Sequence, residues 1–110
     1  MKRMLLVAAT LALWPATAAI AQNPAAKPDL AKAQVIVNQV CAACHGVDGN
    51  SASPANPNLA GLPAEYITTQ LAHFKAGIRA NPVMLGMAST LSPDDMAAVG
   101  AYYAKQKSKG

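Results

Sequence analysis

Aromatic residues are scarce in this chain of 110 residues, where they make up only 5% of the positions. A small chain with so few bulky side chains has a marginal core. A large apolar cofactor would fill the missing volume, but alanine-rich helices that pack closely would also do so. The scarcity of aromatic residues therefore permits a cofactor without demanding one.

The N-terminus has the three parts of a secretory signal. Lys2 and Arg3 come first, an uncharged apolar run follows from Met4 to Trp14, and small residues end in Ala19-Ile20-Ala21. We predict that residues 1–21 are a signal peptide and that the protein is exported. An uncleaved membrane anchor is the alternative, because the uncharged stretch just reaches the length that a spanning helix needs.

Acidic residues are few, and part of the positive charge of the chain lies in the predicted signal peptide. Without residues 1–21, seven Lys and Arg face five Asp and Glu. Nothing in this balance indicates binding to nucleic acid. The chain also lacks internal repeats, so we expect a polar, proline-interrupted lead-in at 22–28 and one small domain at 29–110.

A first helix is predicted to begin at Asp29, a good N-cap residue. Apolar residues then recur every three or four positions, at Leu30, Ala33, Val37, Val40 or Cys41, and Cys44. This period predicts an amphipathic helix whose apolar stripe runs into both cysteines. The following segment, residues 46–62, is rich in Gly, Asn, Ser and Pro and is expected to be a loop.

A second helix is predicted from Pro63, which suits a first helical position, to Gly77, which can close the helix in a left-handed conformation. Its shared face consists of Tyr66, Ile67, Gln70, Leu71 and Phe74. The next connection, Ile78 to Leu91, carries Met84 and Met87. We expect this connection to be mostly irregular.

A last helix is predicted from the run Ser92-Pro93-Asp94-Asp95, which supplies a cap, a first-turn proline and acids at the positive end of the helix dipole. One side of it carries Met96, Val99, Gly100 and Tyr103. Gly100 is small enough to let another helix cross closely. Because no strand pattern is present, the fold class is predicted to be all-α.

The only two cysteines of the chain stand in Cys41-Ala42-Ala43-Cys44-His45. The two thiols lie one helical turn apart and the histidine follows directly, so all three groups can reach one planar ligand. This is the arrangement that a c-type haem requires, with each sulfur adding to a vinyl group and the imidazole reaching the iron. We therefore predict one haem c, bound covalently through Cys41 and Cys44.

Three other uses of the cysteines fit less well. A structural disulfide gives no reason for His45, and a four-residue loop is a poor stabiliser. A thioredoxin-like redox pair calls for a βαβ context that the periodicity does not show. A zinc site lacks a credible fourth ligand.

Residues 29–106 resemble class I cytochrome c, and in particular its bacterial periplasmic monohaem members. The resemblance rests on CHGVDGNS at 44–51, P-x-L-A-G at 57–61, M-x-x-M at 84–87 and L-S-x-x-D at 91–95. It implies the cytochrome c fold, in which three main helices and long loops surround one haem. It also implies a periplasmic location.

The resemblance further implies that the iron is held by His45 and Met84. Spacing alone does not separate Met84 from Met87, since both lie on the same connection, and His73 on the second helix is another possible ligand. The carbonyl of Pro57 matches the family's acceptor for the other ring nitrogen of the ligating histidine, an interaction that would fix the orientation of His45.

Three further residues match family positions near the haem. Tyr66 is similar to a buried aromatic residue beside the haem, and Arg79 and Asn81 to residues near the propionates or the methionine loop. A solvated Arg79 is equally compatible with the sequence.

With His45 and Met84 both bound, the iron has no open position for a substrate, which predicts an electron carrier and not an enzyme. Its partners would be transient protein redox partners, with membranes reached only through partner complexes unless the signal stays uncleaved. Lys105, Lys107 and Lys109 either steer an acidic partner or form a solvated helix end. The alternatives are a haem subunit of a larger dehydrogenase or oxidase, and an open-site haem protein that binds a ligand.

Overall fold

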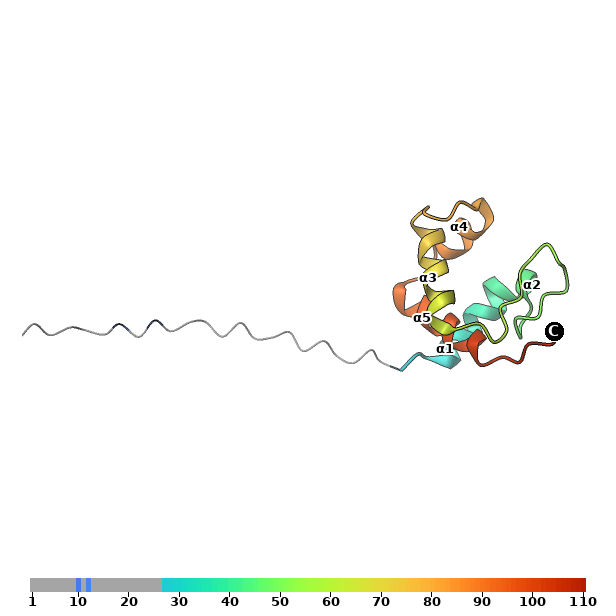
Figure 1. Cartoon of the computed structure of the whole chain (residues 1–110), viewed down its shortest axis with the longest axis horizontal. Helices are drawn as coiled ribbons and strands as arrows, with labels where there is room; N and C mark the ends of the chain where they lie inside the picture. Colours follow the sequence, from blue (N-terminus) through green and yellow to red (C-terminus); the bar gives the residue numbers. More distant parts are fainter. Residues whose placement is uncertain (1–9, 11, 13–26) are drawn as a thin grey trace, which may run out of the picture.

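The computed structural model describes residues 27–110 together with positions 10 and 12. The predicted signal peptide and most of the predicted lead-in lie outside the described residues. Residues 27–110 form helices and loops and contain no strand, as expected for an all-α protein (Figure 1). In the described part of the chain, no helix is both long enough and apolar enough to cross a membrane.

The first helical segment is continuous from Leu30 to His45 but contains a wide turn. It consists of α1 (Leu30–Ile36), the π-helical turn η1 (Val37–Cys41) and α2 (Ala42–His45). Asp29 caps it as predicted, because its Oδ1 accepts a hydrogen bond from the backbone N–H of Lys32 at 3.0 Å. The wide turn was not predicted.

Helix α3 (Ala64–Lys75) confirms the second predicted helix within one residue, since Pro63 immediately precedes it. Ile67, Leu71 and Phe74 are buried. Gly77 closes the helix with a φ of 75°, and its N–H donates to the carbonyl of Phe74.

The expectation of an irregular connection between Ile78 and Leu91 is wrong, because α4 (Pro82–Ala88) forms within it. Asn81 caps this helix by accepting from the N–H groups of Val83 and Met84, both at 3.0 Å, and Pro82 occupies its first turn. The same pair of signals, a polar cap followed by proline, correctly predicted the start of the last helix. Gly86, which disfavours a helix interior, concealed the signal here.

Helix α5 (Pro93–Ala104) begins with a complete capping box, in which the Ser92 hydroxyl accepts from the N–H of Asp95 and the Asp95 carboxylate accepts from the N–H of Ser92. Helix α3 contacts α5 at one end and α4 at the other, and α1 packs on α5 (Figure 1). The buried core at these contacts consists of Val37, Ile67, Leu71, Phe74, Ala88, Leu91, Met96, Val99 and Tyr103.

The predicted close helix crossing occurs at Gly100, where α5 meets α3. A Cβ atom on Gly100 would lie 2.6 Å from the carbonyl oxygen of Ala64 and 2.6 Å from Oγ1 of Thr68. No side chain fits in that space. The crossing therefore depends on glycine at this position.

Candidate functional site

The wide turn η1 keeps the cysteine motif in line with the buried face of the first helix. Ala33, Val37, Cys41 and His45 are spaced four residues apart, and in a regular α-helix each such step drifts by about 40° around the axis. A single wider turn reduces this rotation of the side chains around the helix axis. Ala33 and Val37 are fully buried, Cys41 packs against the core, and His45 is 9% exposed. The sequence left Val40 and Cys41 as alternatives for the next position of the apolar stripe. In the structure, the stripe passes through Cys41 and continues to His45.

The ring of His45 is oriented by the loop that follows it. Its Nδ1 lies 2.8 Å from the carbonyl oxygen of Pro57, twelve residues further along the chain. A carbonyl can only accept, so Nδ1 is the donor, and in the neutral ring the lone pair is then on Nε2. A buried imidazole in this tautomer presents Nε2 as a metal ligand.

The two thiols of the motif are free and differ in exposure. Cys44 is exposed, whereas Cys41 is partly buried against the core. Burial raises the pKa of the Cys41 thiol to about 11, and the nearby Tyr103 hydroxyl acts in the opposite direction. The sequence predicted that both thiols bind one haem, and their placement one helical turn apart next to His45 suits that role.

The loop from residue 46 to residue 62 is closed at Gly49. The Gly49 carbonyl accepts from the N–H of Leu59 at 2.8 Å and from the N–H of Ala60 at 3.1 Å. Gly49 has a φ of 76°, and a Cβ atom there would lie 2.5 Å from the Ala60 nitrogen. Glycine is therefore required at this position. The hydrogen bonds between Gly49 and residues 59 and 60 fix the position of Pro57 beside His45.

Two tyrosines of α5, which sequence reasoning did not connect with the site, fasten the start of this loop. The Tyr102 hydroxyl donates to the carbonyl of Val47 at 2.8 Å, and the Tyr103 hydroxyl donates to the carbonyl of Gly46 at 3.1 Å. Their rings meet edge to face with centroids 5.4 Å apart. An adjacent aromatic pair, in a chain with so few aromatic residues, was the available signal.

The C-terminal tail is bound to the same loop. Asn50 donates through Nδ2 to the carbonyl of Lys107 at 3.0 Å, and its Oδ1 accepts from the N–H of Lys109 at 2.9 Å. The Lys109 ammonium lies 3.3 Å from the Asp48 carboxylate. Of the three lysines that the sequence offered for steering a partner, Lys109 is thus paired within the protein.

Replacing Asp48 by asparagine is expected to make the stability less dependent on acid pH. Hydrogen bonds from Asn50, and then the nearby Lys109, lower the pKa of Asp48 from 3.8 to about 2. A lowered pKa contributes stability above about pH 4, and this contribution is lost as the pH falls toward 2. The melting temperatures of wild type and Asp48→Asn should therefore differ at pH 7 and converge below pH 4.

Asp94→Asn, which makes the same change of charge at an exposed position, is the control for this comparison. A constant difference between wild type and Asp48→Asn from pH 7 to pH 2 would contradict the assignment of the pKa to this contact.

Met84 and Met87 take different positions on α4. Met84 is half-buried and packs against the core, whereas Met87 is 42% exposed. Of the two methionines, Met84 is therefore the one that faces the core.

Of the other predicted site residues, His73, Arg79 and Asn81 lie near the junction of α3 and α4, whereas Tyr66 lies in the first turn of α3. Arg79 donates to Oε1 of Gln70 at 2.8 Å, and its guanidinium carbon lies 4.6 Å from the centre of the Phe74 ring. Tyr66 is 51% exposed on α3, and Asn81 caps α4. His73 uses its carbonyl to accept from the two residues that follow the closing glycine of α3.

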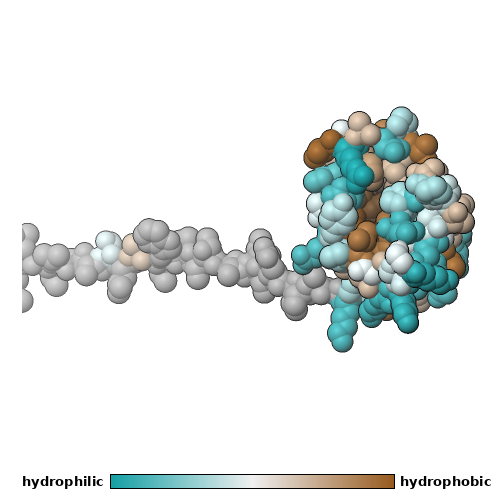
Figure 2. All heavy atoms as spheres, turned by 45° about the vertical axis from the view of Figure 1, so that its right-hand side comes forward, coloured by the Kyte–Doolittle hydropathy of each residue, from teal (hydrophilic) through white to brown (hydrophobic). Residues whose placement is uncertain are grey.

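Figure 2 shows that one face of the molecule is hollowed and that hydrophobic side chains line the hollow. A flat apolar cofactor needs such a surface together with fixed covalent and axial ligands. The chain supplies two free thiols, a buried imidazole with its Nε2 lone pair available, and an inward methionine. The residues present fit a covalently bound haem.

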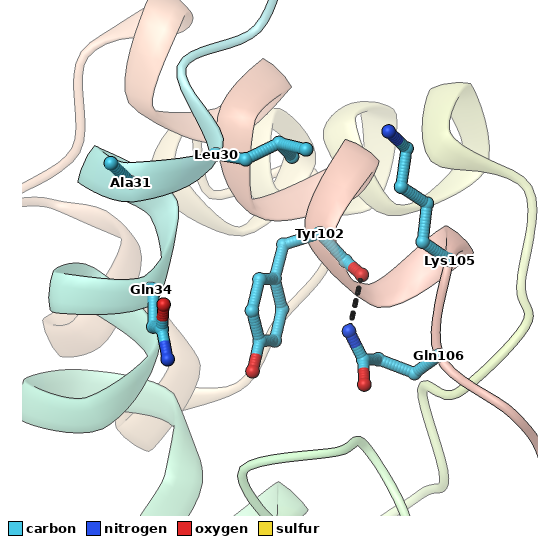
Figure 3. A pocket seen from close by; sticks show the side chains of 6 residues that line it. All are labelled: Leu30, Ala31, Gln34, Tyr102, Lys105 and Gln106. Carbon is cyan, nitrogen blue, oxygen red and sulfur yellow. Dashed lines mark hydrogen bonds between the residues drawn. The ribbon is translucent and has the colours of Figure 1, made fainter.

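A separate open pocket of about 390 Å³ lies between the start of α1 and the end of α5 (Figure 3). Leu30, Ala31 and Gln34 form one side, and Tyr102, Lys105 and Gln106 form the other. Gln106 donates to the carbonyl of Tyr102 at 3.1 Å. None of the predicted haem or iron ligands lines this pocket.

Comparison with known proteins places these features in a family. Residues 28–102 match the family model described as cytochrome C oxidase, cbb3-type, subunit III. The chain is 43% identical over 112 residues to a thiosulfate dehydrogenase electron acceptor of Thiomonas intermedia, a match that covers 100% of this chain and 46% of the relative. It is 36% identical over 94 residues to the cytochrome subunit of sulfide dehydrogenase of Chlorobaculum tepidum, covering 86% of this chain and 84% of the relative.

Among solved structures, reduced recombinant cytochrome c4 from Pseudomonas stutzeri superimposes with a TM-score of 0.66 at 40% identity, covering 72% of this chain and 46% of that chain. The chain thus spans less than half the length of this protein and of the Thiomonas relative.

Proposed function

The chain belongs to the class I c-type cytochromes and carries haem c through Cys41 and Cys44, and from this premise we propose that it is a periplasmic carrier of single electrons with His45 and Met84 as iron ligands. The observation that carries the proposal is the hydrogen bond between His45 and Pro57, which leaves Nε2 of a buried imidazole available next to two free thiols. When bound, the haem supplies an iron that alternates between the ferric and ferrous states.

His45 would be one of the two protein ligands of the haem iron in this proposal. The Pro57 carbonyl holds the ring in one tautomer and one orientation, so little reorganisation of the ligand accompanies a change of oxidation state. The loop that carries Pro57 is in turn fixed by Tyr102 and Tyr103. These residues act through His45 and do not contact a substrate.

Met84 would be the other protein ligand of the iron. Ligation by methionine and histidine together would favour ferrous iron and raise the reduction potential. With two protein ligands, the iron would exchange electrons without binding a substrate. We therefore assign the protein to the carriers and not to the enzymes.

The remaining parts of the proposal concern location and partners. Residues 1–21 serve as the export signal, and residues 29–110 form the haem domain. Tyr66, Arg79 and Asn81 lie near the haem in this assignment. Redox partners dock transiently, because rapid turnover requires a small and weakly held contact.

The proposal is tested by visible spectra of the protein produced in a host that attaches haem c. We expect a sharp reduced spectrum, a methionine-to-iron band at the red end of the oxidised spectrum, and no change on addition of carbon monoxide to the reduced protein. A broad five-coordinate spectrum that shifts with carbon monoxide would instead support an open site that binds ligands.

A second candidate function is a haem subunit of a larger dehydrogenase. It is favoured by the relatives whose names are thiosulfate dehydrogenase electron acceptor and cytochrome subunit of sulfide dehydrogenase. Purification of the tagged protein from its own cells distinguishes the two. A catalytic chain that stays bound in constant proportion at high salt supports the subunit, and a free monomeric cytochrome supports the carrier.

A further inference from the structure

We propose that Lys75 is a positioning residue that holds helix α4, and with it the Met84 thioether, against α3 by donating a hydrogen bond to the carbonyl of Leu91. This inference rests on the proposed ligation of iron by His45 and Met84. It assigns a role to a charged side chain that no part of the haem attachment explains.

The hydrogen bond joins the end of α3 to the turn between α4 and α5, which follows the segment that carries Met84 and Met87. Nζ of Lys75, in the last turn of α3, lies 2.5 Å from the Leu91 carbonyl oxygen, and the bond is partly buried. Leu91 is only 4% exposed, and its N–H donates to the carbonyl of the fully buried Ala88 at 3.0 Å. The Lys75 ammonium therefore binds the turn between the end of α4 and the start of α5.

Helix α4 depends on such anchors because it is short. It has seven residues, fewer than an isolated helix needs for stability in water. Val83, Leu85 and Met87 are exposed, so only part of α4 is held by packing. Met84 and Ala88 provide that packing against the core.

The chain just before α4 is also attached to α3, through a different residue. Arg79, two residues before the α4 cap, donates to Gln70 of α3 and lies over the Phe74 ring. Lys75 and Arg79 thus bind the segment to α3 on either side of Met84. Loss of the Lys75 bond would free the downstream end while the upstream anchor stays in place.

The chemistry of Lys75 suits a strong anchor. A hydrogen bond from a charged donor is stronger than one between neutral groups, and this bond is partly buried because Leu91 is buried, whereas Lys75 itself is exposed. An ammonium in the last turn also interacts favourably with the negative end of the α3 dipole. For function, this anchor would keep Met84 within reach of the iron in the ferric state, which methionine ligation disfavours.

The test follows two signals of the haem-loaded protein during a guanidinium titration, the methionine-to-iron band of the ferric form and the helical far-ultraviolet signal. In Lys75→Met, which keeps the aliphatic stem but removes the donor, we expect the band to vanish well before the helices unfold. The ratio of ferric molecules without bound methionine to those with it should rise about tenfold, the factor expected for a charged hydrogen bond. The reduction potential should fall with it.

Lys75→Arg, which retains a charged donor, should restore the band, and Lys105→Met, a change of the same kind at an exposed position, should behave as wild type. Band and helix signals that shift together in Lys75→Met would show a merely structural role and overturn the proposal, as would an unchanged band. A band that persists in Met84→Ala would overturn the proposed ligation and the role of Lys75 with it. A band lost in Met84→Ala but unmoved in Lys75→Met would overturn the role of Lys75 alone.

Discussion

Met84→Ala is expected to abolish the methionine-to-iron band of the oxidised protein and to make the reduced protein bind carbon monoxide. Removing the thioether would leave the iron with His45 as its one protein ligand, because the His45 to Pro57 bond does not involve α4. The reduction potential should fall by something on the order of 0.2 V, a fraction of the roughly 0.8 V range that axial ligands span. Visible spectra and a potentiometric titration measure both effects.

Met87→Ala is the matched control, since it truncates the same residue type on the same helix at an exposed position. It should keep the band, the potential and the indifference to carbon monoxide. The reverse pattern, with the band lost in Met87→Ala and kept in Met84→Ala, would move the ligand to Met87. Loss of the band in neither variant would exclude both methionines.

Gly100→Ala should destabilise the protein strongly, although alanine is the better helix former by about 1 kcal/mol. The added Cβ would lie 2.6 Å from the Ala64 carbonyl oxygen and from Oγ1 of Thr68, where α3 crosses α5. Because one of these atoms belongs to the backbone, the two helices have to separate. We expect a net loss of about 2 kcal/mol in the free energy of unfolding. For a domain of this size, that lowers the melting temperature by roughly 10 °C.

Gly86→Ala, also within a helix, is the matched control for this prediction. Apart from its chain neighbours and the nearby backbone of its own helix, no atom lies within 4 Å of a Cβ placed at Gly86. Thermal unfolding followed by circular dichroism should therefore show unchanged or slightly raised stability for Gly86→Ala and a marked fall for Gly100→Ala. Equal melting temperatures for the two variants would show that the helices move apart at little cost.

Local signals in the sequence predicted much of the fold because their physics is local. The caps at Asp29 and Ser92 and the left-handed Gly77 act within one helical turn, and all three occur as expected. The same logic applied to Asn81 and Pro82 would have predicted α4. The glycine inside that helix and the expectation of a long loop outweighed the signal.

The wide turn η1 shows a different limit of the sequence. The predicted apolar stripe is ambiguous between Val40 and Cys41 in a regular helix, since both positions fall near the apolar face. No residue type in Val37–Cys41 specifies a π turn. Packing of the helix on α5 decides between the two positions, because the buried Val37 and His45 have to face the same core.

The sequence by itself determined the chemistry of this protein. Two thiols one turn apart and an adjacent imidazole identify covalent haem attachment wherever the helix lies, because all three groups belong to five consecutive residues. Only the tertiary structure decided how the ligands are held. The resemblance to class I cytochrome c had implied the bond from His45 to Pro57, but nothing in the sequence implied the bonds from Tyr103 to Gly46 and from Lys75 to Leu91, which join residues 57 and 16 positions apart. Such pairs are selected by the packing of whole helices, which no local pattern encodes.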